Sequence, residues 1–142
     1  MSVKLMALDV DGTLTDEEGK ISPENANAVR AAAAGGIQVV LATGRPLQGV
    51  EAICSELGVK GPLILVNVSL ILSGDEVWAE TCLSAKDLQT VYQQGAETGN
   101  VSIMAFQPDI VRLWIPADMD KQWISDVMDS FQLFNRVEMP CL

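Results

Sequence analysis

Largely apolar runs recur along the first half of the chain. Their length and their lack of helical periodicity predict strands that are buried on both faces. The three runs are Val3–Val10, Ile37–Ala42 and Leu63–Leu72. After the third run, Gly74-Asp75 predicts a hairpin turn into a short strand at Val77–Glu80.

Two amphipathic segments lie between these runs and predict helices. The first begins with Ser22 as N-cap and Pro23 at the first helical position, and Gly35-Gly36 end it. The second is stopped by Gly58. The expected inward residues are Ala26, Val29 and Ala33 in the first helix and Leu47, Val50, Cys54 and Leu57 in the second. This β-α-β-α-β order predicts a parallel sheet with right-handed crossovers.

From about residue 82 the pattern is that of a mixed α+β unit. Ser84 and Asp87 form a capping box for a helix, and Val101–Phe106 with Ile110–Ile115 predict a hairpin. The expected inward residues are Leu88, Val91 and Tyr92 in this helix and Ile124, Val127, Met128 and Phe131 in a last helix, before a short strand at Leu133–Met139. We therefore divide the chain into residues 1–82, part of a doubly wound, Rossmann-like α/β sheet, and residues 83–142, a partial α+β domain.

The charge and cysteine content narrow the possible partners and location. The 142 residues carry a formal net charge of −10 and include no histidine. This acidity argues against nucleic acid or a membrane as the main partner, and a metal site must use ligands other than His. Cys54, Cys82 and Cys141 form no CxxC pair, which indicates free thiols in a reducing compartment. Because the sequence shows no signal-peptide pattern, we expect a cytoplasmic protein.

Two carboxylates, Asp9 and Asp11, stand at the end of the first apolar run and are followed at once by Gly12 and Thr13. Open α/β sheets bind their ligands at the carboxyl ends of strands. Two acids crowded there repel each other unless a cation or a proton intervenes. The pattern therefore predicts a divalent metal site that also binds phosphate.

The residues around these acids resemble a known family. Asp9-Val10-Asp11-Gly12-Thr13 resembles motif I of the haloacid dehalogenase-like phosphohydrolases, and Ala42-Thr43-Gly44-Arg45-Pro46 resembles their motif II. The motif spacing and the Ile21-Ser22 helix start are similar to those of the Cof-type members, which include archaeal-type phosphoglycolate phosphatases. In that group an α+β cap domain follows the third strand. The resemblance implies that residues 83–142 are the first half of a cap and that the chain is a C-terminally truncated member.

This resemblance implies a Mg²⁺-dependent phosphomonoester hydrolase that acts on a small phosphorylated metabolite. Asp9 would be the nucleophile that forms an aspartyl phosphate, and Asp11 would be the general acid and base. The Asp9 carboxylate and the Asp11 backbone carbonyl would hold Mg²⁺. The phosphate-binding residues would be Gly12, Thr43, Gly44 and Arg45.

The chain also departs from the family pattern. The family has a later Lys that pairs with the nucleophile and a later acidic pair that completes the metal shell. Lys86 and Lys121 lie on expected cap helices and match neither. Where the family often has Asn-Gly after the third strand, this chain has Asn67 followed by Val68. These departures predict low activity for the chain by itself.

Two other interpretations stay open. One is a non-catalytic, oligomeric protein that retains the phosphatase fold for association. The other is a phospho-receiver module, which would require an Asp at the end of the third strand, where the chain has Asn67 and no Asp before Asp75. We further expect a homo-oligomer, most simply a dimer. Without the later strands of the family, the Val3–Val10 strand would have an unpaired edge.

Overall fold

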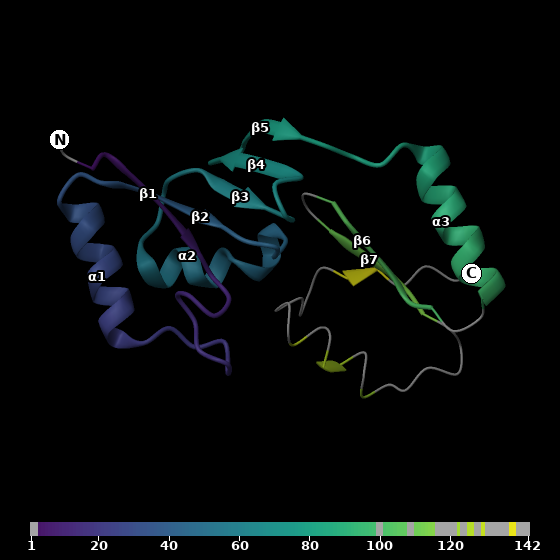
Figure 1. Cartoon of the computed structure of the whole chain (residues 1–142), viewed down its shortest axis with the longest axis horizontal. Helices are drawn as coiled ribbons and strands as arrows, with labels where there is room; N and C mark the ends of the chain where they lie inside the picture. Colours follow the sequence, from purple (N-terminus) through teal and green to yellow (C-terminus); the bar gives the residue numbers. More distant parts are fainter. Residues whose placement is uncertain are drawn as a thin grey trace. The chain divides into compact units, whose positions relative to one another are not determined.

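The computed structural model describes residues 3–98, 101–107 and 110–115, together with residues 122, 125, 126, 129, 137 and 138. Contacts within the chain divide it into two units (Figure 1). The first unit comprises Met1–Arg45 and Val50–Thr81, and the second comprises Pro46–Gly49 and Cys82–Leu142.

The first unit is built on one five-stranded sheet. Its strands follow the order β1-β2-β3-β4-β5. Their bounds are β1 Leu5–Asp9, β2 Gln38–Ala42, β3 Leu63–Leu65, β4 Leu70–Ser73 and β5 Glu76–Glu80. The first three strands are parallel, whereas β4 and β5 pair antiparallel. The predicted α/β fold with a parallel β-α-β-α-β unit is therefore confirmed, and so is the hairpin at Gly74-Asp75.

Helix α1 (Pro23–Ala34) begins as its sequence predicts. The Ser22 hydroxyl accepts a hydrogen bond from the Asn25 N–H at 3.1 Å, and Pro23 occupies the first turn. The second predicted helix is divided into the short 3₁₀ helix η1 (Leu47–Gly49) and α2 (Glu51–Leu57). The division falls at Val50, whose φ of −123° and ψ of −10° lie outside the helical range.

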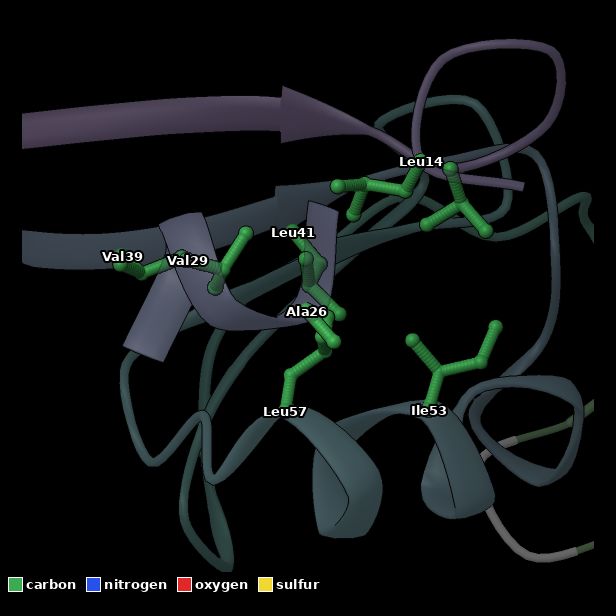
Figure 2. Packing of buried hydrophobic residues seen from close by; sticks show 8 residues of the cluster. Leu14, Ala26, Val29, Val39, Leu41, Ile53 and Leu57 are labelled. Atoms are coloured by element: carbon green, nitrogen blue, oxygen red, sulfur yellow. The ribbon is translucent and has the colours of Figure 1, made fainter. Parts of the chain in front are cut away.

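The hydrophobic core of the first unit lies between the sheet and its two helices. Figure 2 shows Leu41 of the sheet with Ala26 and Val29 of α1 and with Ile53 and Leu57 of α2. All five side chains are buried. Ala33, in the last turn of α1, is exposed, so the buried stripe of this helix is shorter than predicted.

The third apolar run, Leu63–Leu72, is not the single strand that we predicted. The chain reverses in its middle, so that Leu63 in β3 pairs with Leu72 in β4. Three successive residues, Val66, Asn67 and Val68, form the turn with φ values of 49°, 52° and 74°. Hydrophobic pattern gave no sign of this reversal because both arms are apolar and the turn contains neither glycine nor proline.

Valine is an unfavourable residue for such a turn. A β-branched side chain at positive φ is a genuine conformational outlier, and the left-handed region costs about 1–2 kcal/mol per non-glycine residue. Val68 is 66% exposed, so its side chain gains little from burial.

We expect Val68→Gly to raise the free energy of unfolding. Relief of the backbone strain exceeds the entropy of about 0.5–1 kcal/mol that an added glycine costs, which leaves a net gain of roughly 0.5–1 kcal/mol. Urea denaturation followed by circular dichroism measures it. Val77→Gly, the same change in exposed strand β5, is the control and should lower stability. A loss at both positions would contradict strain at Val68.

The second unit contains α3 (Ala85–Thr98) and a three-stranded sheet of β6 (Ile103–Phe106), β7 (Val111–Trp114) and β8 (Val137–Glu138). The capping box is confirmed, since the Asp87 N–H donates to the Ser84 hydroxyl at 3.1 Å. The predicted hairpin is confirmed by antiparallel pairing of β6 with β7. Among described residues, no helix is long and apolar enough to cross a membrane.

The inward face of α3 differs from the prediction. Leu88 and Val91 are exposed, and only Tyr92 and Gly95 of this helix are partly buried. At Gly95 an added Cβ would lie 2.8 Å from the Ile103 side chain, so a glycine permits the close approach. The Tyr92 ring packs edge-on against Trp114 with centroids 5.5 Å apart. The predicted inward residues of the last helix, Ile124, Val127, Met128 and Phe131, lie outside the described residues.

Candidate active site

The loop after β1 begins with a tight reversal around the Val10 carbonyl. The backbone N–H groups of Thr13, Leu14 and Thr15 all donate to this oxygen, at 3.3, 2.9 and 3.0 Å. Gly12 has a φ of 74°, a conformation that glycine adopts without strain. Val10 is fully buried, while Asp9 and Asp11 on either side of it are exposed. The strand thus presents both predicted catalytic acids to solvent at its carboxyl end.

The two acids have different neighbours. The Thr13 hydroxyl donates to Asp9 Oδ2 at 3.1 Å. Asp11 is bound by residues that follow β2, more than thirty positions later in the chain. Parallel pairing of β1 with β2 aligns Asp9 with Ala42, so the loops that follow the two strands meet at one edge of the sheet.

Arg45 binds Asp11 through two of its nitrogens. Its Nε lies 3.1 Å from both carboxylate oxygens, and its Nη2 lies 2.6 Å from Oδ1. The arginine side chain is 9% exposed and the aspartate side chain 55% exposed, so the pair lies at the boundary between core and solvent. Resemblance alone implied that Arg45 would be a phosphate ligand. In the structure the side chain of Arg45 is the ion-pair partner of Asp11.

Thr43 connects the same two loops. It is buried, and its hydroxyl oxygen accepts from the Arg45 backbone N–H at 3.1 Å and lies 3.4 Å from Asp11 Oδ2. Hydrogen bonds therefore bring Thr43 and Arg45 together with Asp11.

Asn67, which stands where the family often has Asn-Gly, is a neighbour of this site. Its Oδ1 lies 3.0 Å from the place that a Cβ on Gly44 would occupy. Its position in a left-handed turn accords with the tolerance of asparagine for positive φ.

Other reactive groups lie apart from these acids. Burial raises the pKa of the Cys54 thiol, and the nearby Glu51 carboxylate raises it further. A thiol with a raised pKa is protonated at neutral pH and is a poor nucleophile, which accords with a core position. Within the described part of the chain, no group of three or more His, Cys, Asp or Glu side chains is placed to hold a metal ion.

The donors at the end of β1 nevertheless suit Mg²⁺. This ion prefers oxygen ligands, and it commonly binds through one or two carboxylates together with water and substrate phosphate. Asp9 supplies an exposed carboxylate that the Thr13 hydroxyl orients through a hydrogen bond. A protein-only cage of ligands is not needed for such a site.

Comparison with known proteins agrees with this geometry. A sequence profile of the haloacid dehalogenase-like hydrolases matches residues 6–135. The chain is 38% identical over 78 residues to 5-amino-6-(5-phospho-D-ribitylamino)uracil phosphatase YcsE of Bacillus subtilis, an alignment that covers 55% of this chain and 29% of the relative. It is 36% identical over 73 residues to phosphoglycolate phosphatase of Thermoplasma acidophilum, which covers 51% of this chain and 33% of the relative.

A solved structure shares the fold over nearly the whole chain. The crystal structure of a haloacid dehalogenase-like hydrolase from Bacteroides thetaiotaomicron matches with a TM-score of 0.81 at 24% identity. The match covers 98% of this chain and 52% of that one. The chain therefore spans about half of the solved structure and about a third of the two relatives.

Proposed function

Because the chain belongs to the haloacid dehalogenase-like hydrolase family, we propose that it carries the nucleophile and the phosphate-binding residues of a Mg²⁺-dependent phosphomonoesterase. The observation that carries the proposal is the hydrogen-bonded set of Asp11, Thr43 and Arg45 beside an exposed Asp9. The two relatives are named as phosphatases of 5-amino-6-(5-phospho-D-ribitylamino)uracil and of phosphoglycolate, which are small phosphorylated metabolites. We propose a substrate of the same class.

In this proposal Asp9 attacks the phosphorus, the bond to the ester oxygen breaks, and Asp11 gives that oxygen a proton. Water then attacks the aspartyl phosphate, Asp11 takes up its proton, and inorganic phosphate leaves with the Asp9 carboxylate restored. Gly12, Gly44 and the Thr43 hydroxyl bind the phosphoryl oxygens. Bound Mg²⁺ would neutralise charge between Asp9 and the phosphoryl group.

Arg45 has two anionic partners in this scheme. In the structure both oxygens of Asp11 accept from its guanidinium, so Asp11 is held as a carboxylate. It must take up a proton from solvent after this ion pair opens before it can give one to the ester oxygen. A phosphoryl dianion is the natural competitor, because guanidinium binds phosphate and carboxylate with the same forked geometry. Substrate would thereby draw Arg45 from Asp11 at the step that needs a proton donor.

Beryllium fluoride with Mg²⁺ tests the proposal without requiring turnover, since it forms a stable mimic of an aspartyl phosphate. We expect ¹⁹F resonances of protein-bound beryllium fluoride with the wild-type chain and their loss in Asp9→Asn. Asp16→Asn is the matched control: Asp16 is an acid of the same loop whose carboxylate binds the backbone of Glu18 and Lys20. Equal binding by all three proteins would contradict Asp9 as the phosphoryl acceptor.

An association role, with or without catalysis, is favoured by the edge of the sheet. Among the described strands β1 pairs only with β2. It carries apolar residues on both faces, and Leu5 is 53% exposed. An open apolar edge is a template for pairing with another chain, so we propose a homodimer that pairs β1 with β1.

Charge selects a register for this dimer. Antiparallel pairing that places Leu5 opposite Leu8 of the second copy also places Lys4 opposite Asp9, twice by symmetry. We expect a dimer at micromolar concentration by sedimentation velocity and a shift toward monomer in Lys4→Glu. Lys60→Glu makes the same charge change at an exposed position between α2 and β3 and should leave the dimer intact. A monomeric wild-type chain would contradict this interface.

A further inference from the structure

The left-handed turn at Val66–Val68 makes a contact with each residue of the segment Thr43–Arg45. The Val66 N–H donates to the Arg45 carbonyl at 3.1 Å, and the Asn67 N–H donates to the Thr43 carbonyl at 3.4 Å. Between them, the Asn67 side-chain oxygen lies over Gly44, 3.0 Å from the position of a Cβ. Three successive residues after β2 are thus held from one side by a single turn.

The turn adopts a conformation that its sequence disfavours. Val66 and Val68 flank Asn67 and both have positive φ. Such conformations persist where surrounding contacts over-determine them, and they concentrate at functional sites. The turn is closed by the pairing of β3 with β4 and by the Ser69 N–H, which donates to the Val66 carbonyl at 3.1 Å. Its contacts with Thr43, Gly44 and Arg45 add to these, so the strained turn and that segment constrain each other.

We propose that Asn67 is a positioning residue that sets the orientation of Thr43–Arg45, and through it the Arg45 guanidinium; its role toward phosphate rests on the proposed function. The Arg45 backbone accepts from the turn while the Arg45 side chain reaches Asp11. A rotation of the Gly44 peptides would therefore move both the Thr43 hydroxyl and the guanidinium relative to Asp11. The Asn67 side chain blocks that rotation because it occupies the space above Gly44.

The rate at which the Arg45 Nε–H exchanges with solvent can be measured by NMR without any ligand. Because this N–H donates to Asp11, a faster rate reports a less well positioned guanidinium. Asn67→Gly keeps a residue that tolerates positive φ but removes the side chain over Gly44. We expect it to speed Arg45 Nε–H exchange about tenfold, in the range of couplings between contacting residues. Val68→Gly relaxes the same turn without changing Asn67, and we expect exchange within about twofold of wild type.

Gly44→Ala provides an independent check of the contact. An alanine methyl at this position would displace the Asn67 side chain, so this variant should speed Arg45 exchange as Asn67→Gly does. The double variant should show the effect of one substitution and not their product, because both remove the same contact. If the effects of Asn67→Gly and Gly44→Ala on the exchange rate multiplied in the double variant, the proposal would be overturned. It would also be overturned if the exchange rate simply followed the global stability of the variants.

Binding of inorganic phosphate in the presence of Mg²⁺ separates this inference from the proposed function. We expect Asn67→Gly to weaken phosphate binding by about tenfold and Val68→Gly to leave it within about twofold. If the wild-type chain binds no phosphate, the proposed function fails, and the Arg45 exchange data still decide whether Asn67 positions the segment. If phosphate binds equally to all variants, the positioning role toward phosphate is wrong.

Discussion

Asp9→Asn should abolish hydrolysis of p-nitrophenyl phosphate, a loss of about 10³-fold or more. A neutral amide is a poor nucleophile toward phosphorus and a poor ligand for Mg²⁺, so both the covalent step and the metal site are lost. Asp9 is exposed and its one described side-chain hydrogen bond comes from Thr13, so the fold should survive the change. Steady-state assays with Mg²⁺ and a thermal melt of each protein measure the two effects.

The wild-type rate for this assay is expected to lie below the ordinary enzyme range of about 1–10³ per second. Neither the later Lys nor the later acidic pair of the family has a match within these 142 residues, and such groups supply much of the transition-state stabilisation. Asp16→Asn is the control and should retain the wild-type rate. Retention of the rate in Asp9→Asn, within tenfold, would show that the measured activity does not use Asp9.

Gly61→Ala is expected to destabilise the first unit by about 3 kcal/mol. A Cβ at Gly61 would overlap the carbonyl oxygen of Val39. Val39 belongs to β2, beside the core residue Leu41, and a strand carbonyl has no alternative position such as a flexible side chain would have. Relief of the overlap therefore requires β2 to move away from the segment that leads into β3.

Urea denaturation monitored by circular dichroism measures this loss. Gly35→Ala makes the same substitution at the end of α1, where φ is −75° and the nearest atoms lie at 3.4 Å, an ordinary contact distance. We expect it to change stability by less than about 0.5 kcal/mol. Similar effects at the two positions would mean that the overlap at Gly61 is relieved without strand separation.

Much of the fold was accessible from the sequence because the relevant signals are local. Ser22 caps the start of α1 and Pro23 lies in its first turn. The Ser84 hydroxyl accepts a hydrogen bond from the backbone of Asp87, three residues later, at the start of α3. The turn at Gly74-Asp75 is equally local. These features depend on residues a few positions apart, whose preferences are not overridden by distant contacts.

Where the sequence misled, the deciding interaction was not local. Two of the three residues in the reversal at Val66–Val68 are valines, which prefer strands. The turn contacts Thr43 and Arg45, more than twenty positions earlier. Similarly, α3 exposes Leu88 and Val91 although both lie on its apolar stripe. Hydrophobic periodicity identifies the most apolar face of a helix, but it does not predict how much of that face other elements bury.

The sequence by itself determined which side chains stand at the ends of β1 and β2, because an apolar run fixes a strand and the residues that follow it are then at its carboxyl edge. Only the tertiary structure decided how those side chains pair. The bonds from Arg45 and Thr43 to Asp11, and the contact of Asn67 with Gly44, depend on strand register and on one strained turn. Register and turn geometry follow from packing across the whole sheet, which no short stretch of sequence encodes.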